Sequence, residues 1–119
     1  RVPVPAAGSG NAYAKMGHPA SGYVVVSAGA LIGRDSSGKC TAARVAVGGL
    51  EGTPHRASAT ESALVGQALN ADTIASAASH AAEGTDPETD IYASADYKRH
   101  VATVYARRAI EEAAQRAGG

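Results

Sequence analysis

The sequence contains no Trp and no Phe, only one Cys and one Met, and as many acidic as basic side chains, 11 of each. A lone cysteine excludes an internal disulfide and a cluster of thiolate metal ligands. It is typical of a reducing compartment, so we expect a cytoplasmic protein. The formal charge of zero argues against a general nucleic-acid binder or a polybasic membrane surface. No apolar run approaches the roughly 20 residues that a membrane-spanning helix requires.

The chain has 119 residues, of which 45% are hydrophobic, mostly Ala and Val. This length suits one domain that buries about two-thirds of the surface exposed by the unfolded chain. Small side chains permit close packing but bury little apolar area per residue, so we expect modest stability. Because residue 1 is not Met, the chain is expected to be a fragment, a processed product or a trimmed chain.

The first half of the chain is predicted to form β-structure. Residues 1–12 contain two prolines and a Gly-Ser-Gly run, which suit an extended lead-in. Residues 23–32 include three consecutive valines, whose stiff side chains favour a strand. Residues 35–38 read Asp-Ser-Ser-Gly, a turn signal that predicts a hairpin with a return strand over residues 40–50. In the return strand Val45 and Val47 alternate with more exposed residue types, which predicts one buried and one partly exposed face.

The second half is predicted to form three helices, over residues 57–65, 70–82 and 94–116. Thr53-Pro54 is a start signal for the first helix and Gly66 a stop signal. Asn70 and Ser94 are the expected caps of the second and third. Strands followed by helices, without alternation, predict an α+β fold. We expect an antiparallel sheet of three to four strands packed against a three-helix layer.

The last helix is predicted to place Tyr97, Val101, Val104 and Tyr105 on its buried face, which three alanines widen. Its basic residues are expected to form a solvated face, with a subunit-facing surface as the alternative. These residues are Lys98, Arg99, His100, Arg107 and Arg108. The spacing also predicts two weak ion pairs, Arg107–Glu111 and Arg108–Glu112.

Several segments combine in a recognisable order. The first is Ala12-Tyr13-Ala14-Lys15, followed by His18-Pro-Ala-Ser-Gly-Tyr23 and a strand. Later segments are Thr53-Pro54-x-Arg56-Ala57, then Glu61, Leu64 and Gly66, then Ala93-Ser-Ala-Asp-Tyr97-Lys-Arg, and Arg107-Arg108-Ala109. In this order they resemble the C-terminal domain of the FAD-binding (medium) subunit of aerobic-type carbon monoxide dehydrogenases. The same domain occurs in related, xanthine dehydrogenase-like molybdenum hydroxylases.

This resemblance implies a role in electron transfer. In such enzymes substrate is oxidised at a molybdopterin cofactor on a large subunit. Electrons then pass through [2Fe-2S] clusters on a small subunit to FAD on the medium subunit. The resemblance implies that residues 13–119 form the C-terminal domain and that residues 1–12 lead in from missing N-terminal FAD-binding domains. Those domains would hold the FAD phosphates, and they would be this domain's partners together with the two other subunits.

Tyr13 and Lys15 are the residues that the resemblance assigns to the flavin. A tyrosine offers a flat face to the ring system, and an ammonium group near the pyrimidine edge favours the reduced, anionic form. The alternative is that Tyr13 caps the sheet and Lys15 is a solvated surface residue. No catalytic residue and no metal ligand are expected, because the four histidines lack the spacing of a metal site.

Other residues are expected to be structural. Arg56 is predicted to pair with Glu61, with Glu51 or with a neighbouring domain. Cys40 lies in a predicted strand, where a buried, unreactive thiol is usual. The alternative function is a free-standing dimerisation or interaction module without redox chemistry. A small hydrolase that uses Cys40 or a serine has no supporting motif.

Overall fold

The computed structural model describes residues 9–17, 24–50, 55–85 and 95–118, and the side chains of residues 15–17, 24, 25 and 118 lie outside this description. The strands are β1 (Ser9–Gly17), β2 (Val24–Arg34), β3 (Cys40–Gly48) and β4 (His55–Arg56). The helices are α1 (Ser58–Leu64), α2 (Ala71–Ala78) and α3 (Ala95–Gly118). Strands thus precede helices along the chain, and the predicted α+β class is confirmed.

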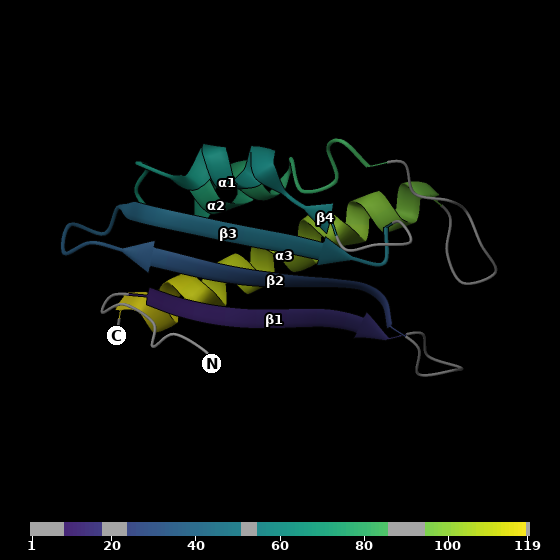
Figure 1. Cartoon of the computed structure of the whole chain (residues 1–119), viewed down its shortest axis with the longest axis horizontal. Helices are drawn as coiled ribbons and strands as arrows, with labels where there is room; N and C mark the ends of the chain where they lie inside the picture. Colours follow the sequence, from purple (N-terminus) through teal and green to yellow (C-terminus); the bar gives the residue numbers. More distant parts are fainter. Residues whose placement is uncertain (1–8, 18–23, 51–54, 86–94, 119) are drawn as a thin grey trace.

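The four strands form one antiparallel sheet in the order β1-β2-β3-β4. The long helix α3 packs along β1 and β2 and covers one face of the sheet (Figure 1). Helix α1 lies against β3, and α2 contacts both α1 and α3. The strands pass in front of α3 in Figure 1, so their other face is turned toward the viewer without a helix over it.

The strand β1 is the largest departure from the prediction, because residues 9–12 belong to this strand rather than to a lead-in. Its sequence, SGNAYAKMG, contains no β-branched residue and has two glycines, so local propensity does not indicate a strand. Tertiary contacts on both sides decide the conformation instead. Eight consecutive residues pair with β2 in regular register, and α3 packs on the inner side.

Gly10 allows the close approach of β1 to α3. A Cβ atom at this position would lie 2.3 Å from the carbonyl oxygen of Ala113 and 2.5 Å from the backbone nitrogen of Ala117. Arg116 adds a hydrogen bond of 2.6 Å from its guanidinium to the carbonyl oxygen of Asn11. The missing side chain of Gly10 therefore lets helix and strand backbones lie in contact.

The predicted hairpin is confirmed. The carboxylate of Asp35 accepts hydrogen bonds from the backbone nitrogens of Ser37 at 2.9 Å and Lys39 at 3.0 Å. Gly38 has φ +86°, a left-handed conformation that glycine adopts without strain. The turn chemistry of this segment is local, which is why the sequence suffices to predict it.

The core consists mostly of small residues. The inward positions of the two central strands are Val26, Ala28, Ala30, Ile32, Ala43, Val45 and Val47. Their alternation with exposed neighbours confirms the predicted two-sided pattern of the return strand. The largest fully buried side chains include Ile32 and Leu64, together with Ile110 from α3.

The first helix begins at Ser58, one residue after its predicted start at residue 57. Residues 55 and 56 form β4 and pair with β3, and α1 starts at Ser58. The expected start signal, Thr53-Pro54, lies outside the described residues, and Ala57 occupies the N-cap position. The backbone nitrogen of Ala57 bonds to the carbonyl oxygen of Val45, so sheet pairing prolongs the extended chain up to the helix. The predicted stop is confirmed, because Gly66 has φ +84° directly after the helix end.

The second helix begins as predicted. The side chain of Asn70 caps α2 by accepting a hydrogen bond of 2.8 Å from the nitrogen of Thr73. The helix ends at Ala78 rather than near residue 82, and turns follow over residues 79–84. Helix α3 begins at Ala95 and ends at Gly118, close to the predicted limits, whereas the expected cap Ser94 lies outside the described residues.

The buried face of α3 differs from the prediction. Val101 is buried as expected, but Tyr97 is 47% exposed. The residues that face the sheet are chiefly Ala102, Ala106, Ala109, Ile110 and Ala113. Alanines occupy this face because the helix backbone lies so close to the strands that aromatic rings do not fit between them.

The charged residues of α3 also depart from the prediction in part. Lys98 is 6% exposed and so does not belong to a solvated face. The pair Arg107–Glu111 is confirmed at 3.5 Å. Glu112 pairs with Arg116 at 2.5 Å instead of with Arg108, whose guanidinium lies 4.8 Å from the ring centre of Tyr105.

Candidate functional site

The face of the sheet opposite α3 carries small side chains across its centre. Strand pairing places Tyr13 opposite Gly29, Gly29 opposite Ala46, and Ala46 opposite Arg56. These four residues form one row across the sheet, which we call the outer row. It has an aromatic ring at one end, a guanidinium at the other, and almost no side chain between them.

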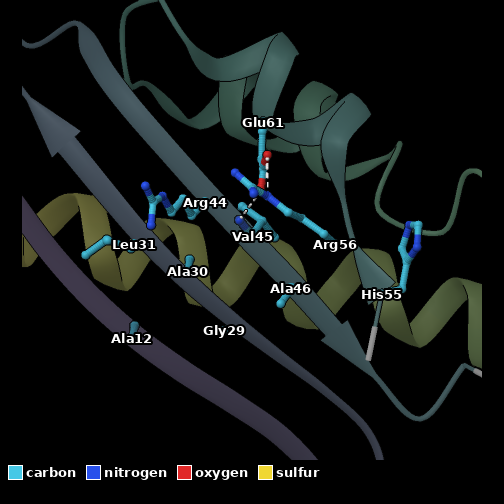
Figure 2. A pocket seen from close by; sticks show the side chains of 10 residues that line it. All are labelled: Ala12, Gly29, Ala30, Leu31, Arg44, Val45, Ala46, His55, Arg56 and Glu61. Atoms are coloured by element: carbon cyan, nitrogen blue, oxygen red, sulfur yellow. Dashed lines mark hydrogen bonds and ion pairs between the residues drawn. The ribbon is translucent and has the colours of Figure 1, made fainter. Parts of the chain in front are cut away.

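A shallow groove of about 500 Å³ lies over part of this face. Its lining residues are Ala12, Gly29, Ala30, Leu31, Arg44, Val45, Ala46, His55, Arg56 and Glu61 (Figure 2). Gly29 and Ala46 contribute so little side chain that the strand backbone itself forms much of the surface. Leu31 and Arg44 lie beside each other in the register, next to the outer row. The groove therefore combines an apolar floor with a basic rim.

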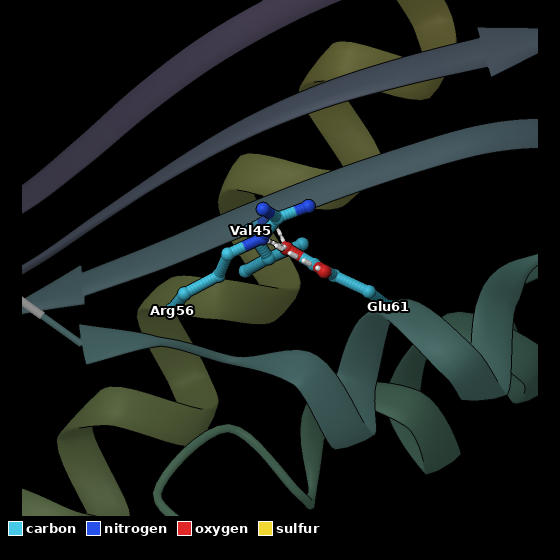
Figure 3. A network of polar contacts seen from close by, with 3 residues as sticks. All are labelled: Val45, Arg56 and Glu61. Carbon is cyan, nitrogen blue, oxygen red and sulfur yellow. Dashed lines mark hydrogen bonds and ion pairs between the residues drawn. The ribbon is translucent and has the colours of Figure 1, made fainter.

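One arginine of this rim is held in place by a buried carboxylate (Figure 3). Nε of Arg56 donates to both carboxylate oxygens of Glu61, at 2.9 and 3.1 Å, and the backbone nitrogen of Val45 donates to Glu61 Oε2 at 2.8 Å. The Glu61 side chain is 12% exposed, whereas that of Arg56 is 64% exposed. The bond to Glu61 raises the pKa of Arg56 above its usual value. The predicted pair Arg56–Glu61 is thus confirmed, while the alternative partner Glu51 lies outside the described residues.

The second arginine of the rim, Arg44, projects from β3 and is exposed. In contrast, the neighbouring His55 points away from Arg56 (Figure 2). Its Nε2 atom is buried and has no hydrogen-bond partner. Arg44 and Arg56 are therefore the two guanidinium groups that line the groove.

Tyr13 lies on the same face but does not line the groove. Its side chain is 62% exposed, and a Cβ atom at Gly29 would lie 3.9 Å from its Cδ1 atom. Its flat ring thus lies beside a strand segment without a side chain. Lys15 belongs to β1 and pairs with Ser27 in the register, but its side chain lies outside the described residues.

Cys40 is a structural residue. It is 1% exposed, and its thiol donates to the carbonyl oxygen of Ala42 at 3.2 Å. Burial raises the pKa of the thiol, which opposes formation of the reactive thiolate. The predicted buried cysteine is confirmed. In the described part of the chain no three His, Cys, Asp or Glu residues are grouped as a metal site would require.

No helix in the described ranges has an apolar stretch long enough to cross a membrane.

Comparison with known proteins decides the family. The model of the CO dehydrogenase flavoprotein C-terminal domain matches residues 11–113. The chain belongs to this family. That membership covers β1 to α3, and hence both the outer row and the groove.

Named members of the CO dehydrogenase flavoprotein family agree with this assignment. The carbon monoxide dehydrogenase medium chain of Afipia carboxidovorans is 35% identical over 117 residues, which are 98% of this chain and 40% of that protein. The 6-hydroxypseudooxynicotine dehydrogenase complex subunit alpha of Paenarthrobacter nicotinovorans is 32% identical over 92% of this chain and 37% of its own. A chain of quinoline 2-oxidoreductase from Pseudomonas putida 86 superposes with a TM-score of 0.88 and 33% identity, over 99% of this chain and 40% of that one. This chain therefore spans about 40% of the relatives that it matches.

The groove was not foreseen from the sequence, although both arginines that line it were visible. Alternation along residues 40–50 predicts that Arg44 and Ala46 share a face. It does not reveal that Gly29 lies opposite Ala46, because the register of β2 against β3 depends on the turn between them. The position of Arg56 was also missed, since β4 is only two residues long.

Proposed function

We propose that this chain is the C-terminal domain of the FAD subunit of a molybdenum-containing hydroxylase or dehydrogenase. In this proposal it covers the flavin and contacts partner subunits, while FAD receives electrons from molybdenum through [2Fe-2S] clusters on other chains. The observation that carries the proposal is the family match over residues 11–113. The presence of a single, buried cysteine supports a cytoplasmic location.

The relatives support a role that does not depend on the substrate. They are named for three different compounds: carbon monoxide, 6-hydroxypseudooxynicotine and quinoline. A domain shared by enzymes of such different substrates is not expected to select the substrate. We infer that substrate selection takes place on another chain, and that this domain serves the electron-accepting side.

The exposed ring of Tyr13 fits a covering role for the flavin. A planar ring system requires a flat, apolar surface, and Tyr13 beside Gly29 offers one. Lys15, two residues along β1, is the proposed cation near the pyrimidine edge. When bound, FAD would supply the redox chemistry. Tyr13 would exclude water from one side of the ring system, and Lys15 would favour negative charge at its edge.

The proposal is tested with the complete flavoprotein subunit. Tyr13→Ala is expected to shift the visible absorbance of bound FAD and its redox potential, because the ring loses an aromatic neighbour. Tyr13→Phe keeps the ring and is expected to retain the original spectrum. Tyr97→Ala is the matched control, since Tyr97 is also exposed but lies on α3. An unchanged spectrum and potential in Tyr13→Ala would reject the assignment of Tyr13. A complete subunit that contains no FAD would reject the proposed function.

The alternative of a free-standing interaction module is not favoured. The named relatives include a medium chain and a complex subunit, and this chain matches about 40% of each length. If the alternative were correct, this chain alone would form a stable assembly and none of its binding partners would contain flavin.

A further inference from the structure

Strand β1, which carries Tyr13, lies at one edge of the sheet. Among the described strands it pairs with β2 alone. Its sequence has poor strand propensity, and its register with β2 shifts between Met16 and Gly17. An edge strand of this kind is expected to fray or shift unless another contact fixes it. The position of Tyr13 therefore depends on contacts that β1 makes outside the strand pairing.

The last turns of α3 fix β1 shortly before Tyr13, where helix and strand lie against each other (Figure 1). At Gly10 the two backbones are in contact, since a Cβ atom there would lie 2.3 Å from the carbonyl oxygen of Ala113. At Asn11 the guanidinium group of Arg116 donates a hydrogen bond of 2.6 Å to the backbone carbonyl oxygen. Tyr13 is the next residue after Asn11 whose side chain lies on the outer face. The contact with α3 thus ends two residues before the proposed flavin contact.

Glu112 orients Arg116 for this contact. A second guanidinium nitrogen of Arg116 donates to Glu112 Oε1 at 2.5 Å, one helical turn earlier. A planar guanidinium group with two nitrogens engaged keeps one direction, and its charge strengthens the bond to the carbonyl oxygen. The side chain of Arg116 is 54% exposed, so its removal leaves the buried alanines of α3 in place.

We propose that Arg116 is a positioning residue for the flavin contact. By binding the carbonyl oxygen of Asn11, it fixes the place of Tyr13 relative to the ring system of bound FAD. This inference rests on the proposed function, in which Tyr13 covers that ring system. The interaction of two aromatic groups depends on their separation and tilt, and protein groups near a flavin tune its potential. A residue that displaces Tyr13 therefore alters the flavin without touching it.

The alternative is that Arg116 only stabilises the domain. A purely stabilising residue changes the free energy of unfolding and leaves the flavin of the folded subunit as it was. A positioning residue changes the flavin in the folded subunit, and it does so only while Tyr13 is present. The two roles therefore differ in a property that can be measured.

The test compares the fluorescence lifetime and the redox potential of FAD in the complete subunit. A tyrosine ring quenches an excited flavin by electron transfer, at a rate that falls steeply with the distance between the rings. Tyr13→Ala is expected to lengthen the lifetime, because the quenching ring is removed. Arg116→Ala is expected to lengthen it by a smaller amount and to shift the potential in the same direction as Tyr13→Ala. Arg107→Ala is the matched control and is expected to change neither, since Arg107 pairs with Glu111 at the same spacing on α3.

A double-mutant cycle tests whether Arg116 acts through Tyr13. In the Tyr13→Ala background, Arg116→Ala is expected to leave the lifetime and the potential unchanged, because no ring remains to be displaced. Effects of the two substitutions that add would overturn the proposal. Arg116→Ala that lowers the urea midpoint but leaves the flavin unaltered would also overturn it, because the role would then be purely structural.

Glu112→Ala is a second variant, in which the guanidinium group remains but loses the carboxylate that orients it. It is expected to lengthen the lifetime less than Arg116→Ala does. If Arg116→Ala yields no subunit that contains FAD, the result with Glu112→Ala decides, and an unchanged lifetime overturns the proposal. Tyr13→Ala without any effect on the flavin would instead contradict the flavin contact of the proposed function. A change in Tyr13→Ala together with none in Arg116→Ala would overturn the positioning role alone, so the two failures are distinct.

Discussion

The carboxylate of Glu61 on α1 accepts a hydrogen bond of 2.8 Å from the backbone nitrogen of Val45 on β3. Strand β4 has only two residues and pairs with Ala46 and Val47, so it does not extend to this nitrogen. The side chain of a helix residue thereby satisfies a backbone donor of the sheet. The same carboxylate also binds Arg56. Glu61 therefore satisfies a backbone donor of β3 and orients one of the two guanidinium groups that line the groove.

Glu61→Ala is expected to destabilise the fold by about 2–3 kcal/mol, because it leaves the buried nitrogen of Val45 without a partner. Urea denaturation measures the change in unfolding free energy. Arg56→Ala removes only the exposed member of the pair, and it is expected to destabilise the fold much less than Glu61→Ala. If both substitutions cost the same, the backbone bond is not the important interaction of Glu61.

Gly10→Ala is expected to cost about 3 kcal/mol, since its methyl group would overlap the carbonyl oxygen of Ala113 and push α3 away from β1. Gly29→Ala is the control on the other face. There the nearest atom would be 3.9 Å away, and we expect a change within about 0.5 kcal/mol. Thermal or urea unfolding compares the two variants. A mild effect at Gly10 would show that helix and strand separate easily.

The Asp35 carboxylate is expected to make stability fall in acid. A hydrogen bond from the Ser37 hydroxyl, followed by one from the backbone of Lys39, lowers the pKa of Asp35 below its ordinary value of 3.8. A lowered pKa in the folded state means that the contribution is present above this value and is lost as the pH falls through the folded pKa.

Asp35→Ala should therefore lower the urea midpoint at neutral pH, and its difference from the wild type should shrink at pH values below about 4. Ser36→Ala, in the same turn, is the control and should leave the pH dependence unchanged. A difference that stays constant down to the acid transition would contradict a role of the charged carboxylate.

Cys40 is expected to react slowly with thiol reagents in the folded protein. Its ionisation at alkaline pH is expected to destabilise the fold. Burial raises the pKa of the thiol above its ordinary value of 9.0. With the folded pKa above the unfolded value, stability is retained below the unfolded pKa and decreases as the pH rises toward the folded one. Urea midpoints measured between neutral and alkaline pH should decline less steeply in Cys40→Ala. Identical slopes would show that ionisation of Cys40 is not coupled to unfolding.

Local signals in the sequence predicted the elements whose geometry is locally decided. The hairpin at Asp35, the cap at Asn70 and the stop at Gly66 all depend on hydrogen bonds or dihedral angles within a few residues. The alternation around Val45 also follows from the two-residue repeat of a strand. These features need no knowledge of distant parts of the chain.

Prediction failed where distant segments decide the conformation. Strand β1 has poor strand propensity, and pairing with β2 and packing of α3 impose its conformation. Tyr97 was placed in the core by helical periodicity alone. Because α3 lies close to the sheet, only small side chains such as alanine fit between them, and Tyr97 remains exposed.

The candidate site shows the same division. Tyr13, Arg56 and Glu61 were identifiable as residues, and the pairing of the last two was one of three alternatives predicted for Arg56. Their arrangement in the outer row and around the groove was not predictable, since it requires the register of four strands.

The sequence by itself determined the turns, the fold class and the family. The turns follow from short-range chemistry, the fold class from strands followed by helices, and the family from the series of motifs along the chain. Only the tertiary structure decided which side chains share the face of the sheet opposite α3. It also decided that the Glu61 carboxylate accepts a hydrogen bond from the backbone nitrogen of Val45. Those relations join residues far apart in the chain, and the free energy that selects them comes from burial and pairing across strands rather than from local preference.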